Sequence, residues 1–157
     1  MLRQAGEQIE SAMENYSQIE KQLVMLRSRL IPKQFSVLLA NGSKLETSFC
    51  MQALSQLPIH VAVVKDGLQA LVRATSEPFD LMIAANAIPY ISGTAVIAAL
   101  KLSDPRFSRI RTILLTSDEN LMNSDRRDTD ADYTIFKDGN LMSNLFDAVK
   151  RSLALPN

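Results

Sequence analysis

The sequence predicts an α/β domain with a five-stranded parallel sheet, doubly wound by helices and preceded by a coiled-coil helix. Short apolar runs alternate with helical stretches from residue 35 onward. The near-continuous hydrophobicity of these runs is typical of strands that are buried on both faces. Residues 1 to 30 carry a heptad spacing instead. We therefore expect two parts, a coil over residues 1–31 and a domain over residues 35–154.

The N-terminal segment places apolar residues at alternating steps of three and four. Because this spacing averages about 3.5 residues per turn, it keeps one stripe facing a partner helix in a supercoil, which indicates a homodimer. An amphipathic helix that lies on its own domain is the alternative. Few complementary charges flank the stripe, so its parallel or antiparallel orientation stays open. The seam consists of Leu2, Ala5, Ile9, Ala12, Tyr16, Ile19, Leu23, Leu26 and Leu30. Ile31-Pro32 is expected to end the helix.

Five apolar runs have the length of strands, and five stretches between and after them have the length of helices. The predicted strands cover residues 35–40, 60–64, 81–84, 112–115 and 133–136, and the predicted helices 45–57, 67–75, 94–102, 119–127 and 141–153. This alternation favours right-handed crossovers with helices on both faces of the sheet. Functional groups in such sheets gather at the carboxyl ends of the strands.

Composition narrows the possible partners. Seventeen basic and seventeen acidic residues cancel, which disfavours nucleic acid, because surfaces that bind it are usually basic. No apolar run reaches the about 18 residues of a membrane span, and the polar N-terminus differs from a signal peptide. We therefore expect a cytoplasmic protein without a membrane partner. The single cysteine, Cys50, is interpreted as a small core residue.

Five local patterns, in this order and at these spacings, resemble the receiver domains of bacterial response regulators over residues 35 to about 154. They are Val37-Leu38-Leu39, Val64-Lys65-Asp66-Gly67, the pair Pro89 and Gly93, Leu115-Thr116-Ser117, and Phe136-Lys137. The resemblance implies a flavodoxin-like (βα)5 fold and a role in two-component signal transduction.

The resemblance also implies where an active receiver would carry its chemistry. Two acidic residues after the first strand hold magnesium together with the phosphate-accepting aspartate after the third. These positions fall on Asn41, Gly42 and Ala85. Such residues supply neither the charge that anchors magnesium nor a nucleophile. We expect no catalytic residue, metal or other cofactor. Asn86 is a slipped match, but an amide does not accept phosphate.

Two further receiver positions are retained, Thr116 for the hydroxyl that contacts phosphate and Lys137 for the lysine that pairs with it. For Lys137 a structural role, paired with a nearby carboxylate or reaching into solvent, is weighed against the binding of an anion. Thr134 stands where the family has an aromatic switch residue, and Tyr133 lies one residue too early. Asp138 stands where the family usually has proline. The resemblance therefore implies that the phosphorylation switch is lost as well.

Other candidate chemistry is sparse. His60 has no catalytic partner at motif spacing, which favours a structural role, and the scattered glycines form no phosphate-binding loop. The charged run over residues 125–132 is mixed in sign and indicates solvated surface, with partner recognition as the alternative.

The sequence thus predicts a non-enzymatic pseudo-receiver that serves as a protein–protein interaction module in bacterial signal transduction, dimerised by its coil. The expected partner is an unidentified signalling protein, such as a histidine kinase or another regulator. A C-terminal output fragment of a hybrid sensor kinase or phytochrome is one alternative. An anion sensor that uses the pocket around Ala85, Thr116 and Lys137 is another. A residual phosphorelay role would need one of three alternative acceptors, namely Ser92, Ser117 or Asp118.

Overall fold

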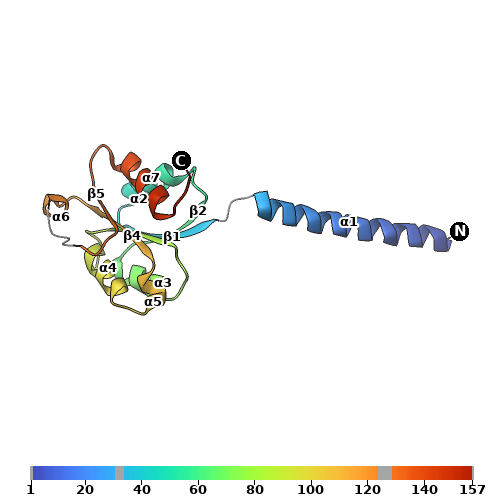
Figure 1. Cartoon of the computed structure of the whole chain (residues 1–157), viewed down its shortest axis with the longest axis horizontal. Helices are drawn as coiled ribbons and strands as arrows, with labels where there is room; N and C mark the ends of the chain where they lie inside the picture. Colours follow the sequence, from blue (N-terminus) through green and yellow to red (C-terminus); the bar gives the residue numbers. More distant parts are fainter. Residues whose placement is uncertain (1, 31–33, 124–128, 157) are drawn as a thin grey trace. The chain divides into compact units, whose positions relative to one another are not determined.

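The computed structural model describes residues 2–30, 34–123 and 129–156, with side chains described for residues 7–22, 34–122 and 129–156. The chain divides into two compact units, Met1–Lys33 and Gln34–Asn157 (Figure 1). The predicted helix stop at Ile31-Pro32 and the predicted helical residues 124–127 lie outside the described residues. Within the described residues, no helix combines the length and hydrophobicity needed to cross a membrane.

The first unit is a single helix, α1, Leu2–Leu30, which covers the predicted coil segment. Three seam residues with described side chains, Ile9, Tyr16 and Ile19, are 62%, 66% and 53% exposed. Ala12 is exposed as well. The remaining seam side chains lie outside the described ones, namely those of Leu2, Ala5, Leu23, Leu26 and Leu30. Pairing of this stripe with a second helix stays a prediction.

The second unit is built on a parallel sheet in the order β2-β1-β3-β4-β5, which confirms the predicted doubly wound α/β fold. The strands are β1 Phe35–Ala40, β2 Ile59–Val64, β3 Leu81–Ala85, β4 Arg111–Thr116 and β5 Tyr133–Phe136. The prediction placed every strand correctly, to within a residue at each end. β2 and β5 lie at the two edges of the sheet.

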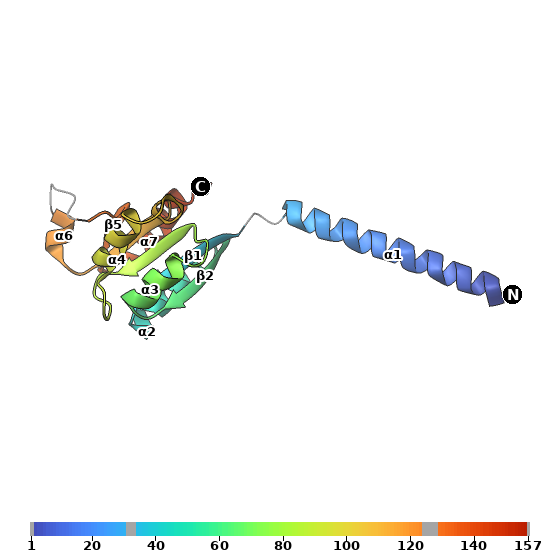
Figure 2. The same ribbon diagram turned by 90° about the horizontal axis from the view of Figure 1, so that it is seen from below.

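Helices cover both faces of the sheet. They are α2 Lys44–Leu54, α3 Gly67–Ala74, α4 Gly93–Lys101, α5 Pro105–Ser108, α6 Glu119–Asn123 and α7 Leu141–Ser152. α2 and α7 pack together on one face, and α3 and α4 on the other (Figures 1 and 2). The sequence pattern did not predict α5, because four residues are too few to show a period. Asp104 caps it and Pro105 begins it.

The prediction that α2 reaches residue 57 is wrong. The helix ends at Leu54, and the hydroxyl of Ser55 donates to the carbonyl of Gln52 at 3.0 Å. Proline disfavours the helical conformation of the residue before it, and Pro58 follows Leu57. Leu57 instead packs against the core from the turn before β2.

Two apolar layers enclose the sheet because successive strand residues point to opposite faces. On the α3 and α4 face the core includes Leu38, Met82, Ile97 and Leu114. On the α2 and α7 face it includes Leu39, Ile83, Leu115 and Leu145. This burial on both faces is the physical reason for the continuous hydrophobicity of the strands.

Two aspartates join neighbouring strands at the amino ends of the sheet. Asp80, directly before β3, accepts the backbone N–H of Ser36 through Oδ2 at 2.8 Å. Asp132, directly before β5, accepts the backbone N–H of Thr112 in the same way, also at 2.8 Å. Asp132 belongs to the charged run that the sequence analysis interpreted as surface, and its contact gives at least this residue a structural role.

Cys50 is buried between α2 and the sheet. Desolvation and, to a smaller extent, the nearby carboxylate of Glu46 raise the pKa of its thiol, the ammonium of Lys137 lowers it, and the pKa lies at about 11. The thiol is therefore neutral at physiological pH and packs as a small apolar group.

Candidate functional site at the carboxyl ends of the strands

The predicted receiver positions come together at the carboxyl edge of the sheet. Asn41 directly follows β1, Ala85 ends β3, Thr116 ends β4 and Lys137 follows β5. The backbone N–H of Lys137 donates to the carbonyl of Thr116 at 2.8 Å. Parallel strands that end at one edge thus gather residues that are distant in the sequence.

Ala85, which the resemblance assigns to the phosphate-acceptor position, is buried and offers only a methyl group. Its carbonyl oxygen lies so close to Gly93 that a Cβ there would approach it to 2.5 Å. Gly93 is therefore required for the close contact between the end of β3 and the start of α4. The loop between them is folded tightly over the rim of the sheet.

The side chain of Asn86 holds this same loop in place through hydrogen bonds. Its Oδ1 accepts the backbone N–H of Thr94 at 3.2 Å and the hydroxyl of Thr94 at 2.9 Å. Its backbone carbonyl accepts the N–H of Gly93 at 3.1 Å. The residue thus holds the first turn of α4 in place.

Gly42, which the resemblance assigns to the second acidic position, lies close to residues of two other loops. A Cβ at this glycine would meet the carbonyl oxygen of Lys65 at 3.3 Å and Cδ of Pro89 at 3.5 Å. A Cβ at this position would be tight against the Lys65 carbonyl and in ordinary van der Waals contact with Pro89.

Glu46 is the site residue that the sequence analysis missed. Its Oε1 accepts the side-chain amide of Asn41 at 2.5 Å and lies 3.0 Å from Nζ of Lys137. The carboxylate and the ammonium side chains are only 19% and 21% exposed. One carboxylate oxygen thus joins the end of β1 to the end of β5 through α2.

A sequence signal for Glu46 exists in the pattern Ser43-x-x-Glu46, which is typical of a helix N-terminal capping box. Ser43 does cap α2, since its hydroxyl accepts the N–H of Glu46 at 3.2 Å. The N–H of Ser43, however, donates to Oδ1 of Asn41 at 2.9 Å. Because Asn41 satisfies this donor, the Glu46 carboxylate is available to pair with Lys137. The sequence pattern identifies the cap but not this long-range pairing.

The residues at this edge do not fit a magnesium ion, which the resembling family would bind here. Ala85 and Gly42 have no side-chain oxygen, and the oxygen of Asn41 already accepts the N–H of Ser43. Among the described residues, no group of three or more His, Cys, Asp or Glu side chains lies close enough together to hold a metal ion. The ammonium of Lys137, paired with Glu46, adds a positive charge to the edge.

The residues that the resemblance assigns to the receiver switch make the following contacts. The hydroxyl of Thr116 is buried and accepts the N–H of Asp118 at 3.0 Å, so it fixes the turn after β4. Thr134 is half-buried, and Tyr133 packs into the layer on the α2 and α7 face. Tyr133 therefore lies on the opposite face of the strand from the position that Thr134 occupies. Asp138 is exposed and accepts the N–H of Asn140 at 2.8 Å.

The alternative phosphate acceptors have local structural contacts. Ser92 caps α4 by accepting the N–H of Ala95 at 3.2 Å, and Asp118 accepts the N–H of Asn120 at 2.9 Å. Ser117 is exposed after β4, and His60 is exposed on the edge strand β2. These contacts account for Ser92 and Asp118 without a catalytic role.

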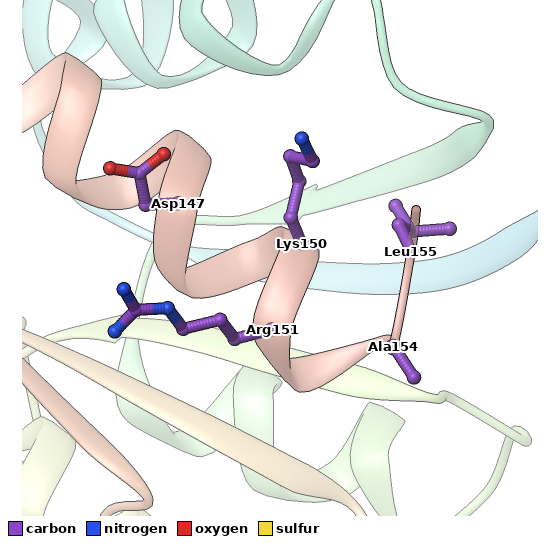
Figure 3. Close-up of a pocket in the computed structure, with 5 residues that line it drawn as sticks. All are labelled: Asp147, Lys150, Arg151, Ala154 and Leu155. Carbon is purple, nitrogen blue, oxygen red and sulfur yellow. The ribbon is translucent and has the colours of Figure 1, made fainter. Parts of the chain in front are cut away.

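A polar pocket of about 220 Å³ lies away from this edge, at the end of α7. It is lined by Asp147, Lys150, Arg151, Ala154 and Leu155 (Figure 3). Figure 3 shows the side chains of Lys150 and Arg151 pointing in different directions. Lys150 Nζ lies over the ring of Phe146, 5.3 Å from its centroid. The charged groups that line the pocket do not converge on one point, and we assign the pocket no function.

No protein-family model matches the chain, and no curated protein matches it. Solved structures do. The chain is 24% identical to the phosphorylated cyanobacterial phytochrome response regulator RcpA, with a TM-score of 0.62 over 79% of this chain and 97% of that one. It is 19% identical to the receiver domain of a sensor histidine kinase from Pseudomonas aeruginosa PAO1 that has magnesium in its active-site cleft, with a TM-score of 0.66 over 77% and 98%.

A third similar structure is the signal receiver domain of a signal transduction histidine kinase from Syntrophus aciditrophicus. It is 25% identical, with a TM-score of 0.65 over 76% of this chain and 90% of that one. The five-stranded parallel sheet in the order β2-β1-β3-β4-β5 agrees with these structural matches. The unit Gln34–Asn157 therefore has the fold of response-regulator receiver domains.

Proposed function

We propose that the chain is a pseudo-receiver, a module with the receiver fold that accepts no phosphate and acts in two-component signalling by binding another protein. Its α1 pairs with α1 of a second copy in this proposal. The observation that carries it is the carboxyl edge of the sheet. There Asn41, Gly42 and Ala85 stand at the positions that correspond to the three carboxylates, and the nearby carboxylate of Glu46 is paired with Lys137.

Phosphoryl transfer needs a nucleophilic oxygen and positive charge placed where negative charge develops. Ala85 has no nucleophile, and the ammonium of Lys137 lies 3.0 Å from the Glu46 carboxylate. An incoming anion would have to displace that carboxylate from the lysine. This competition favours the structural interpretation of Lys137 and counts against the anion sensor.

The Asn41–Glu46–Lys137 contacts also suggest how the module works without a switch. In these contacts, side chains of the protein itself connect β1, α2 and the end of β5. A domain held in this way presents one surface to its partner whether or not phosphate is available. Its regulation then lies in abundance or in the helix α1, not in covalent modification at position 85.

A second candidate is that the domain forms the output segment of a sensor histidine kinase. The similarity to two receiver domains taken from histidine kinases supports this placement. The long helix α1 directly before the domain is also suited to carry a signal from a preceding unit. The chemistry at the carboxyl edge is the same in both candidates.

Incubation of the full chain with acetyl phosphate and magnesium, followed by intact-mass measurement, tests the proposal. We expect no adduct, while the response regulator RcpA under the same conditions serves as the positive control. A mass increase of one phosphoryl group on this chain would overturn the pseudo-receiver proposal. Peptide mapping would then identify the acceptor, with Ser92, Ser117 and Asp118 as the residues to inspect first.

A further inference from the structure

The strand β2 forms an open edge of the sheet, and its backbone groups on that side have few partners. β2 pairs with β1 alone (Figure 2). The carbonyl groups of Pro58 and Val64 accept backbone N–H groups from the β1 side, from Phe35 and Asn41, each at 3.0 Å. Because backbone hydrogen-bonding direction alternates along a strand, the even-numbered residues of β2 face β1 and the odd-numbered ones face the open edge.

Two of the four outward-facing residues, Ile59 and Lys65, use their N–H groups in local contacts. The N–H of Ile59 donates to the carbonyl of Leu57 at 2.8 Å, and the N–H of Lys65 donates to Oε1 of Gln69 at 3.3 Å. Within the described residues, Val61 and Val63 are left with both backbone groups directed to the edge. The open hydrogen-bonding segment is therefore short and sharply bounded.

An apolar groove of about 460 Å³ runs beside this edge. It is lined by Val63, Val64, Leu68, Gln69, Val72 and Arg73. Leu68 and Val72, one turn apart on α3, are 52% and 56% exposed. Valine and leucine side chains that stay half exposed beside unpaired backbone groups are typical of a surface that another chain covers.

The strand also lacks the features by which proteins protect an edge. Its sequence, Ile59-His60-Val61-Ala62-Val63-Val64, has no proline, lysine or carboxylate, and all six residues pair with β1 in one continuous register. Edge strands of this kind are templates for the addition of another strand.

We propose that β2 pairs antiparallel with β2 of a second copy, about a two-fold axis that passes beside Ala62. In this register Val61 exchanges both backbone hydrogen bonds with Val63 of the second copy, and Val63 does so with Val61. Each open N–H thereby finds an open carbonyl, so the segment is self-complementary, as a two-fold interface requires. Ile59 and Lys65, whose N–H groups are already bonded, fall outside the exchanged pairs.

The groove supports a second copy as the occupant. A two-fold axis perpendicular to the sheet places both α3 helices on the same face, one on each side of the junction. Leu68 and Val72 of each copy then approach the equivalent residues of the other and cover the exposed apolar surface. Ala62, opposite its own equivalent at the centre, is small enough to leave room between the helices. This pairing does not depend on α1 and adds a second contact to any coiled coil.

The test uses the full chain with the coil seam disrupted by Tyr16→Asp and Ile19→Asp, so that only the sheet edge can associate. We expect this variant to form dimers in a concentration series by sedimentation equilibrium. Adding Leu68→Glu and Val72→Glu should make it monomeric, while adding Leu102→Glu should leave the dimer unchanged. Leu102 is a matched control because it is 88% exposed and lies outside the groove.

Hydrogen exchange gives an independent measurement on the protein without the α3 substitutions. The amides of Val61 and Val63 should become protected as concentration rises, while the amide of Ala62, which faces β1, should be protected throughout. The proposal is overturned if the seam variant stays monomeric up to about 1 mM, or if the Val61 and Val63 amides exchange at one rate at every concentration. A failure of the coil itself is read separately, as a monomeric mass for the chain that carries Leu68→Glu and Val72→Glu with the native seam.

Discussion

Helices α1 and α7 have the same kind of apolar pattern and opposite surroundings. In α7, Leu145 and Val149 are fully buried against the sheet. In α1, Tyr16 and Ile19, spaced one turn apart in the same way, are more than half exposed. The comparison teaches that a stripe identifies the face a helix will bury but not the surface that covers it. For α7 the chain supplies that surface itself, and for α1 we propose that a second copy does.

The largest effect should come from charging the α1 seam. Tyr16→Asp with Ile19→Asp removes four large side chains from a dimer interface, each worth about 1.5 to 3 kcal/mol when buried. The dissociation constant of the coil should rise by more than about 1,000-fold. Sedimentation equilibrium at low concentration measures it, with Leu68→Glu and Val72→Glu present in both proteins so that the sheet edge does not contribute.

The matched control for the seam is Ser17→Asp with Gln18→Asp, which adds the same charge to the same turn outside the stripe. If both variants weaken association equally, the stripe is not the interface, and the difference between α1 and α7 needs another explanation.

The second largest effect concerns α7, the buried helix of the comparison. Leu145→Ala leaves a cavity under α7, and we expect the free energy of unfolding to fall by about 2 to 5 kcal/mol. Urea denaturation followed by circular dichroism measures this loss. Asn144→Ala, at an exposed neighbouring position, should change stability by less than about 0.5 kcal/mol. Similar losses for the two variants would mean that α7 is no better buried than α1.

The buried thiol of Cys50 gives a pH dependence that an exposed group would not. Its pKa is raised from 9.0 to about 11, so the unfolded chain loses this proton at lower pH than the folded one. The contribution is fully present below pH 9 and is lost as pH rises toward 11, with a total of about 2 to 3 kcal/mol. Denaturation curves across this range, compared with those of Cys50→Ala, isolate the thiol. If the free energy of unfolding fell equally with pH in the two proteins, the assignment of this pH dependence to Cys50 would be contradicted.

The smallest effect concerns the ion pair of the candidate site. A double-mutant cycle with Glu46→Gln and Lys137→Met should give a coupling energy of about 1 kcal/mol, since both side chains are mostly buried and exposed pairs give less. The exposed pair Arg73–Glu77 is the matched comparison and should show weaker coupling. Equal couplings would mean that solvent screens the candidate site as fully as it screens the surface.

The predictions from sequence failed where local pattern carries no information about distant contacts. The inner strands β1, β3 and β4 were placed because burial on both faces leaves a continuous apolar run, and the partly buried edge strands β2 and β5 were placed by their short apolar runs. The assignment of Ala85 to the acceptor position stays a prediction, which rests on the spacing of Pro89 and Gly93 in the resembling family. Glu46 was missed because its partner, Lys137, is close only after the sheet has formed.

The sequence by itself determined the alternation of strands and helices, the presence of Asn41, Gly42 and Ala85 where the resemblance leads us to expect carboxylates, and the existence of an apolar stripe on α1, because each depends on residue identity and short spacing. Only the tertiary structure decided that Glu46 pairs with Lys137 and that Asn86 holds the start of α4. It alone also showed that Val61 and Val63 turn their backbone groups to an open edge. These features depend on strand order and register, which bring together residues that no local pattern connects.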